Sequence, residues 1–238
     1  MLLNGRTAIV YGAGGPVGSA VARAFTRVGA TVFLAGRNRA RLEAVARGLD
    51  RAEVAAVDVL DHAATCAHAD AIAEATGRID IAFNAVANDD VQGTPLLDMT
   101  PEDVVRPVTK AVTAHLHLAT AVARHMVARR SGVILAMGGG REAIPLLGGA
   151  HVAWAALAGM ARQLAAELGP RGVRALWLLS PGSPDADAAD QEADTVHTLL
   201  GRRPTLAEVG DLAAFLASDR AATMTATEVN MTGGAVVD

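Results

Sequence analysis

The sequence is very poor in cysteine, tyrosine and lysine. Its 238 residues include one cysteine (Cys66), one tyrosine (Tyr11) and one lysine (Lys110). A single cysteine excludes an internal disulfide and a cysteine-based zinc site. No histidine pair has both metal-ligand spacing and a third ligand nearby, so we expect no bound metal. A reaction that uses a tyrosine and a lysine on one helix would therefore need other residues in this protein.

Charge and hydropathy exclude further classes of protein. The net charge is −4 and the pI is near 6.0, so no overall basic field favours nucleic acid as a partner. No apolar run reaches the roughly 18 residues of a membrane span, and Gly5 and Arg6 interrupt the N-terminus before a signal pattern forms. We therefore expect a cytoplasmic protein without a membrane partner. Arginine provides all but one of the 21 basic residues and alanine is abundant, which is typical of a high-GC bacterial genome.

Strand and helix signals alternate along the whole chain. We predict strands at 6–11, 31–35, 53–57, 80–84, 132–137, 173–179 and 227–231, and helices at 16–28, 38–48, 61–76, 101–129, 149–168 and 205–217. This alternation predicts an α/β protein over residues 1–238: a single-domain Rossmann fold whose doubly wound, seven-stranded parallel sheet has helices on both faces. Residues 180–203 interrupt the rhythm. We interpret them as a substrate lid, with an inert solvated loop as the alternative.

A glycine-rich loop follows the first predicted strand and opens the first predicted helix. Its candidate cofactor-binding residues are Gly12, Gly14, Gly15, Pro16, Val17 and Gly18. Glycines allow the backbone to approach a pyrophosphate, and the free N–H groups of the following helix attract its negative charge. Pro16 suits a first helical turn, where its missing donor costs little. The loop therefore predicts a dinucleotide site, with a purely structural turn as the alternative.

Two later strand ends refine this prediction. Gly36 and Arg37 end the second strand, where NAD-binding folds usually place an acid that accepts hydrogen bonds from the ribose hydroxyls. A small residue followed by arginine leaves room for a 2′-phosphate and neutralises it, which favours NADP(H) over NAD(H). Alternatively, Arg37 is only a solvated residue at a helix start. Asp58 and Val59 end the third strand and could bracket an adenine, unless Asp58 instead caps the helix that begins near Asp61.

These motifs together resemble the short-chain dehydrogenase/reductase superfamily, and the resemblance covers essentially the whole chain. The glycine loop is similar to that family's TGxxxGxG, and residues 79–87 look like its fourth strand and NNAG motif, of which Asn84 is kept. Residues 164–174, the turn Ser180-Pro181-Gly182, and residues 215–219 and 232–234 match further family signatures. The resemblance implies that Asn84, Pro181 and Gly182 border a nicotinamide cofactor, that the substrate is a small molecule, and that two long helices pack in a homodimer or homotetramer.

The resemblance also implies an Asn-Ser-Tyr-Lys set that this chain does not match. Counting back from Glu167 places the tyrosine position at Ala150 and the lysine position at Trp154, and the serine position falls at Gly139. In the family, the lysine and the cofactor ribose lower the pKa of the tyrosine so that it can exchange a proton with the substrate. All three positions hold residues that cannot transfer a proton.

Three residues are candidate substitutes. His151 is adjacent to the tyrosine position, but it is rotated by about 100° from residue 150 on a helix, so it is either an acid/base or a residue of the pocket rim. Glu142 follows the fifth strand and could act as an acid if burial raised its pKa; otherwise it is a solvated charge. His115, on the fourth helix, could approach the pocket.

Three functions are consistent with these observations. The first is an NADP(H)-dependent oxidoreductase that acts on a small, apolar carbonyl or alcohol with a non-standard or absent proton-transfer set. The second is a non-redox enzyme on the same scaffold, such as a cyclase, isomerase or dehydratase. The third is a non-catalytic partner subunit that binds nucleotide or no cofactor at all.

Overall fold

The computed structural model describes residues 1–140, 144–182 and 198–237, and its centre is a parallel sheet of seven strands in the order β3-β2-β1-β4-β5-β6-β7. The strands are β1 (Thr7–Tyr11), β2 (Thr31–Gly36), β3 (Ala52–Ala56), β4 (Ile81–Asn84), β5 (Gly132–Gly138), β6 (Val173–Leu179) and β7 (Glu228–Asn230). The helices are α1 (Pro16–Arg27), α2 (Arg39–Ala46), α3 (His62–Thr76), α4 (Pro101–Ala128), α5 (Gly149–Leu168) and α6 (Leu206–Ala217), with short 3₁₀ turns η1 (Leu96–Asp98), η2 (Gly169–Arg171) and η4 (Asp219–Ala221). The predicted fold class is confirmed.

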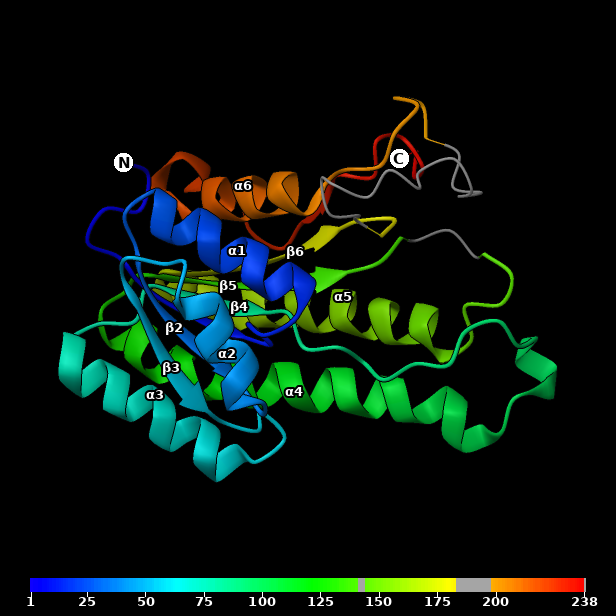
Figure 1. The fold of residues 1–238 in the computed structure, drawn as a ribbon, viewed down its shortest axis with the longest axis horizontal. Helices are drawn as coiled ribbons and strands as arrows, with labels where there is room; N and C mark the ends of the chain where they lie inside the picture. Colours follow the sequence, from blue (N-terminus) through cyan, green and yellow to red (C-terminus); the bar gives the residue numbers. More distant parts are fainter. Residues whose placement is uncertain (141–143, 183–197, 238) are drawn as a thin grey trace.

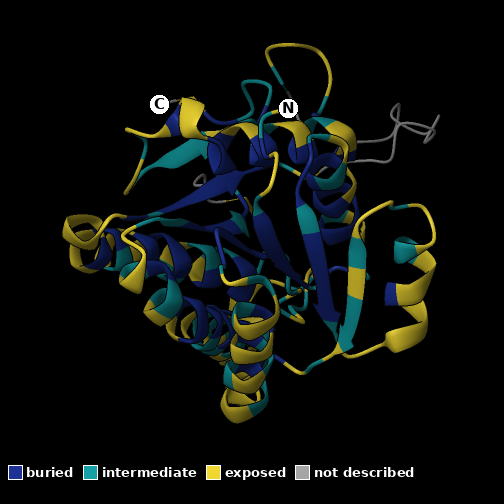
Figure 2. Ribbon diagram, turned by 90° about the vertical axis from the view of Figure 1, so that its left-hand side faces the viewer, coloured by how far each residue is buried: buried dark blue, intermediate teal, exposed yellow. Residues whose placement is uncertain are grey.

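Helices cover both faces of this sheet. Figure 1 shows α1 and α6 on one side, and α3, α4 and α5 on the other. The sheet lies between them; its inner strands are largely buried, whereas the edge strands β3 and β7 and the outer faces of the helices are partly or fully exposed (Figure 2). Strands covered on both faces read as continuous apolar runs, which is why β1 (TAIVY) and β6 (VRALWLL) show no polar alternation.

The two faces of β1 contribute to two separate cores. Ala8 and Val10 pack with α1 and α6 residues, whereas Ile9 and Tyr11 pack with residues of α3 and α4. Successive side chains of a strand point to opposite faces, so one five-residue strand joins both cores. This position places the end of β1 at the centre of the molecule.

Helix boundaries follow their capping residues closely. Thr100 caps α4 by accepting the Asp103 N–H, and Asp61 caps α3 by accepting the Ala64 N–H. The predicted helix 38–48 and strand 53–57 differ slightly from the structure: α2 ends at Ala46, and β3 is shifted by one residue because its register with β2 pairs Val32 with Ala52. Such pairing is a tertiary property that local sequence does not encode.

The order in which the chain adds strands to the sheet reverses between β1 and β4. The chain moves from β1 outward to β2 and β3, then returns across the sheet to β4 and continues to β7. In open α/β sheets, the crevice at the carboxyl ends of the strands on either side of such a switch point is the usual ligand site. Tyr11 and Asn84, the last residues of β1 and β4, are paired there.

Candidate functional site

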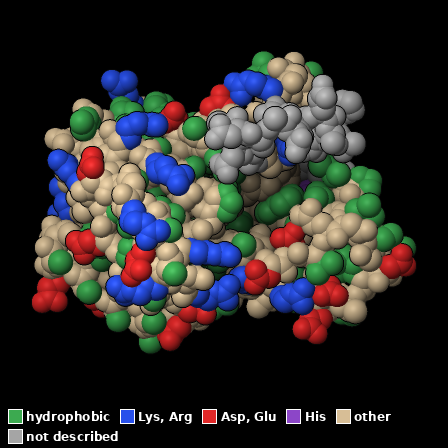
Figure 3. Space-filling view, viewed as in Figure 1, with side chains coloured by type: hydrophobic (Ala, Val, Ile, Leu, Met, Phe, Trp, Pro, Cys, Tyr) green, Lys and Arg blue, Asp and Glu red, His purple; other side chains and the backbone are tan. Residues whose placement is uncertain are grey.

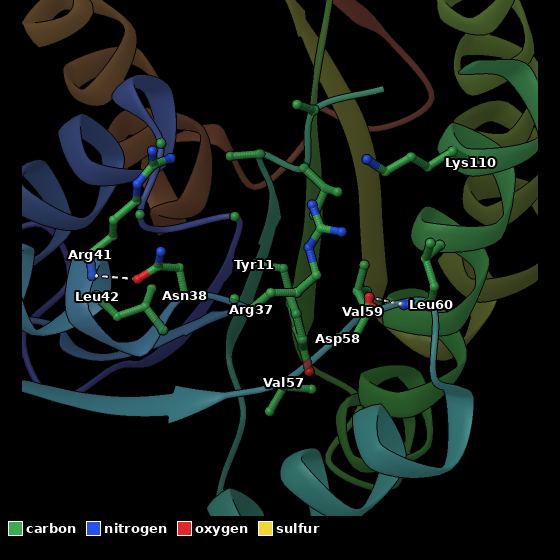
Figure 4. Close-up of a pocket in the computed structure, with 17 residues that line it drawn as sticks. Tyr11, Arg37, Asn38, Arg41, Leu42, Val57, Asp58, Val59, Leu60 and Lys110 are labelled. Atoms are coloured by element: carbon green, nitrogen blue, oxygen red, sulfur yellow. Dashed lines mark hydrogen bonds between the residues drawn. The ribbon is translucent and has the colours of Figure 1, made fainter. Parts of the chain in front are cut away.

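A pocket of about 220 Å³ opens at this switch point. Its walls come from the loop after β1, the end of β2, the loop after β3, the loop after β4 and α4, and they comprise Tyr11, Gly12, Gly14, Gly15, Gly36, Arg37, Asn38, Arg41, Leu42, Val57, Asp58, Val59, Leu60, Ala85, Val86, Ala87 and Lys110. Figure 4 shows these side chains around the cavity. We call it the nucleotide pocket, because the predicted phosphate loop and the predicted adenine residues both line it.

Two glycines of the loop are required by close backbone contacts. Gly12 has φ +79°, and a Cβ there would lie 2.4 Å from the carbonyl oxygen of Ala85. A Cβ on Gly18 would lie 2.3 Å from the carbonyl oxygen of Gly12. Pro16, Val17 and Gly18 form the start of α1 and do not line the cavity.

The first turn of α1 is open to an anion. Its N-cap, Gly15, provides no side-chain cap, and Pro16 occupies the first helical position. The first N–H groups of a helix lack intrahelical acceptors, and the helix dipole makes this end partly positive. A phosphate at Gly14 and Gly15 would receive these donors.

Three cationic side chains line the same pocket. Arg37 and Arg41 come from the end of β2 and from α2, and Lys110 points in from α4 (Figure 4). Lys110 forms an ion pair with Asp89, whereas the guanidinium groups of Arg37 and Arg41 have no hydrogen bond or ion pair within the described part of the chain. Basic side chains gather over α1 and α2 on the face seen in Figure 3. The end of β2 carries no carboxylate, so this wall suits an anionic group.

The loop after β3 forms the opposite wall. Asp58 accepts a hydrogen bond from the Leu60 N–H at 3.0 Å, and Asp61, not Asp58, caps α3. The capping alternative for Asp58 is therefore wrong. Val57, Val59 and Leu60 add apolar surface beside it.

Asn84, the last residue of β4, holds the loop after β4 in place beside the pocket. Its Oδ1 accepts the Val86 N–H at 3.1 Å, and its Nδ2 lies 3.4 Å from Nδ1 of His115, which is 1% exposed. Burial lowers the pKa of His115 to about 4, so the ring is neutral and its Nδ1 can accept from the amide. Because Val86 lines the pocket, this contact fixes the loop after β4.

The burial of His115 makes stability depend on pH. The unfolded chain takes up a proton on this histidine near pH 6.5, and the folded chain only near pH 4, so the stabilisation is present above pH 6.5 and is lost as pH falls to 4. We expect His115 to account for a loss of about 3 kcal/mol in unfolding free energy over that interval. Denaturant unfolding of His115→Asn at several pH values should show a correspondingly flatter slope; a slope equal to wild type would assign the loss to other groups.

Tyr11 is a core residue and not part of a catalytic pair. Its hydroxyl lies 3.3 Å from Nδ1 of His68 on α3, and the residue is 1% exposed. Burial, and secondarily the nearby Cys66, raises the pKa of Tyr11 above its ordinary range, so the phenol stays protonated. Lys110 approaches the pocket from α4 with its ammonium on Asp89. The two residues are on different elements and have different partners.

The resemblance predicts Gly139, Ala150 and Trp154 at the family's serine, tyrosine and lysine positions, and all three residues are closely packed in the structure. Ala150 is fully buried in the first turn of α5. The indole of Trp154 lies over Gly139, where a Cβ would be 2.4 Å from the ring. A serine at position 139 and a tryptophan at position 154 cannot both keep these positions. Glu142 lies outside the described residues, as do residues 183–197 of the predicted lid.

His151 and the turn after β6 lie outside the nucleotide pocket. His151 lines a separate cavity with Trp154, and Pro181 and Gly182 follow β6 without lining the nucleotide pocket.

No described helix is long and apolar enough to cross a bilayer.

Known proteins are similar to this chain over its full length. A family model described as enoyl-(acyl carrier protein) reductase matches residues 12–236. The chain belongs to the short-chain dehydrogenase/reductase superfamily. Within it, the D-threitol dehydrogenase of Mycolicibacterium smegmatis is 30% identical over 250 residues, which cover 98% of this chain and 93% of that protein. This membership confirms the resemblance and makes the chain a relative of dehydrogenases and reductases.

Solved short-chain dehydrogenase structures have the same fold. A short-chain dehydrogenase from Burkholderia cenocepacia J2315 in complex with NADP has a TM-score of 0.85 at 27% identity and covers 99% of both chains. NAD⁺-bound xylitol dehydrogenase has a TM-score of 0.85 at 23% identity, with 98% of this chain and 100% of that chain covered, which shows the fold alone.

Two residues and one short segment that line the nucleotide pocket were not predicted as site residues. Arg41 lies in the first turn of α2, four residues after Arg37, and this nearness in sequence could have indicated a second cation at the same strand end. Lys110 was noted as the single lysine of the chain, which does not lie on the helix where the resemblance places the family's lysine. Ala85–Ala87 were read as a family motif, and their place against Gly12 depends on the pairing of β1 with β4.

Proposed function

We propose that this protein is an NADP(H)-dependent oxidoreductase of a small alcohol or carbonyl compound whose proton transfer does not use a tyrosine–lysine pair. The observation that carries the proposal is the wall formed by Arg37 and Arg41. Two guanidinium groups without partners in the described chain line the nucleotide pocket, at a strand end that carries no acid. An arginine fork matches the oxygens of a phosphate and remains charged at any physiological pH.

The pocket fits the rest of the dinucleotide as well. Gly14, Gly15 and the start of α1 would hold the pyrophosphate, and Arg37 and Arg41 the 2′-phosphate. Asp58 and the apolar residues beside it would border the adenine. When bound, the nicotinamide supplies the hydride chemistry, which this chain's own side chains cannot supply.

The proton must travel by another route. His115 has no extra proton to donate near neutral pH, because burial lowers its pKa to about 4 and leaves the ring neutral, and its Nδ1 faces the Asn84 amide. Its role is to position the loop after β4. Among the described candidates, His151 remains, together with water and the hydroxyl of the substrate itself.

The relatives favour redox chemistry over the other functions considered. One is named for oxidation of threitol, a small alcohol, and one was solved with NADP. These names support a small alcohol or carbonyl substrate, and they favour an oxidoreductase over a cyclase, an isomerase, a dehydratase or a non-catalytic subunit. The apolar character of the substrate, the cytoplasmic location and the dimer or tetramer stay predictions.

Removing the Arg37 guanidinium should weaken NADPH binding selectively. We expect Arg37→Ala to lower NADPH affinity by about 10- to 100-fold, the value of one or two hydrogen bonds to a charged group, and to leave NADH affinity unchanged. Titration with each nucleotide, followed by nicotinamide fluorescence, measures both constants. Arg39→Ala is the matched control, because Arg39 bonds Glu43 and does not line the pocket.

Two results would contradict the proposal. Equal affinity of the wild type for NADPH and NADH would remove the role of Arg37 in cofactor choice. If NADPH binds and none of a panel of ketones, enones and quinones causes its absorbance to decay, the protein is not an oxidoreductase of that substrate class.

A further inference from the structure

A second cavity, of about 210 Å³, lies between α5 and the sheet beyond the end of β5. One wall is the face of α5 that carries His151, Trp154, Ala155, Ala158 and Arg162, and the other consists of Gly138–Gly140, Trp177, Leu179 and Glu228. No residue lines both this cavity and the nucleotide pocket. Its volume is close to the 220 Å³ or so of the nucleotide pocket.

Both tryptophans of the chain line this cavity. Trp177 is 1% exposed and held in place: its Nε1–H donates to Glu228 Oε2 at 2.7 Å, and the Arg162 guanidinium lies 5.0 Å from its ring centroid. Trp154 is held over Gly139. Trp154 is only partly buried, so its indole provides most of the flat apolar surface for a planar ligand, and Trp177 adds the small part of its ring that reaches the cavity.

His151 is one of the polar residues of this cavity, together with Arg162 and Glu228. Its Nδ1 is buried and has no hydrogen-bond partner among the residues that the structure describes. Buried polar atoms are paired in the great majority of cases, so an unpaired ring nitrogen on a cavity wall indicates a missing water or ligand atom. His151 is the third residue of α5.

A hydroxyl group fits this nitrogen better than a carbonyl does. A neutral imidazole has one donor and one acceptor nitrogen, and which of them is Nδ1 depends on the tautomer. A hydroxyl can donate to Nδ1 or accept from it, whereas a carbonyl can only accept. The required ligand therefore has a flat apolar body for the indoles and a hydroxyl for His151.

We propose that this cavity is a binding site for a compact, planar molecule with one hydroxyl group, which bonds to Nδ1 of His151 while the ring contacts Trp154 and Trp177. The inference rests on the proposed function in one respect: Gly138–Gly140 border both this cavity and the carboxyl edge of the sheet, so we also assign this chemistry to the substrate. The site itself needs no bound nucleotide.

Phenol and toluene test the proposal, because they differ only by a hydroxyl in place of a methyl group. Tryptophan emission is the readout, since both tryptophans line the cavity. We expect saturable changes with both compounds and an affinity for phenol about tenfold higher, the value of one hydrogen bond to a buried, otherwise unpaired group. His151→Leu should remove this preference and keep toluene binding. His125→Leu, a histidine on α4 paired with Asp70, should bind as the wild type does.

Two outcomes overturn the proposal: no saturable change with phenol in the folded wild type, or an unchanged preference for phenol in His151→Leu. Circular dichroism confirms that the variant is folded, and Trp154→Phe provides a second check by removing one reporter while keeping a flat ring. NADPH titration of the same samples by nicotinamide fluorescence reports on the nucleotide pocket alone. If the wild type binds NADPH but not phenol, this site is refuted and the proposed function stands. If it binds phenol but not NADPH, the site stands and the proposed function is refuted.

Discussion

Gly12→Ala should abolish most of the nucleotide affinity of this protein. The residue has φ +79°, and its new Cβ would lie 2.4 Å from the Ala85 carbonyl oxygen, 2.6 Å from the Ala85 carbonyl carbon and 2.8 Å from the Val86 nitrogen. These are backbone atoms of the loop that forms the far wall of the nucleotide pocket, so relief of the collision must move one loop or the other. We expect NADPH affinity to fall about 100-fold and unfolding free energy by on the order of 3 kcal/mol.

Gly77→Ala is the matched control for this prediction. Gly77 has nearly the same backbone angle, φ +72°, at the end of α3, but a Cβ there meets nothing within 4 Å. It should cost about 1 kcal/mol from backbone strain alone and leave nucleotide binding unchanged. Chemical denaturation and NADPH titration measure both quantities. If the two variants behaved alike, strain and not contact with Ala85 would explain the need for glycine at position 12.

Rebuilding the proton-transfer set should raise carbonyl reduction by about 100-fold, the lower end of what a positioned acid contributes. The combined variant is Gly139→Ser, Ala150→Tyr and Trp154→Lys. All three changes are needed, because Ala150 is fully buried and the Trp154 indole occupies the space beside Gly139. Removal of that indole provides room for the serine and for part of the tyrosine ring. Steady-state oxidation of NADPH with a panel of ketones is the measurement.

The contact between residues 139 and 154 provides an internal control. Gly139→Ser alone should destabilise the protein by about 1 to 3 kcal/mol through collision with the indole, and it should cost much less in a Trp154→Lys background. Additive effects on unfolding free energy would show that the indole moves freely. A folded triple variant that binds NADPH but turns over no faster than the wild type would mean that Ala150 is not the tyrosine position.

The position of the first strand shows why much of the fold can be predicted from sequence. Ala8–Tyr11 form an apolar run, a glycine loop follows, and Pro16 opens α1, so the apolar run, the glycines and the proline together predict strand, turn and helix. Thr100 and Asp61 likewise mark the starts of α4 and α3 by side-chain caps that act within three residues. These features depend only on residues that are close together in the sequence, so they can be predicted without knowing the tertiary structure.

The site depended on contacts between distant parts of the chain. Asp58 was open to two interpretations until Asp61 was found to cap α3, and Glu142 lies outside the described residues. His115 was a candidate acid, but its burial against Asn84, 31 residues earlier, makes it a support for the loop after β4. The spacing of a histidine along a helix gives its direction; only the packed neighbours decide its desolvation and hence its pKa.

The sequence alone predicted a parallel α/β protein, a phosphate-binding loop, and an arginine, Arg37, where an acid would select NAD; it also shows that tyrosine and lysine each occur once. The α/β fold is confirmed, and the loop and the role of Arg37 stay predictions. They follow from composition, periodicity and short-range spacing. Tertiary structure decided where the two rare residues lie. It buried Tyr11 against His68, turned Lys110 into the nucleotide pocket, and placed Trp154, at the predicted lysine position, on Gly139. Each outcome depends on which surfaces the sheet and helices bring together, and that is set by packing across the whole fold.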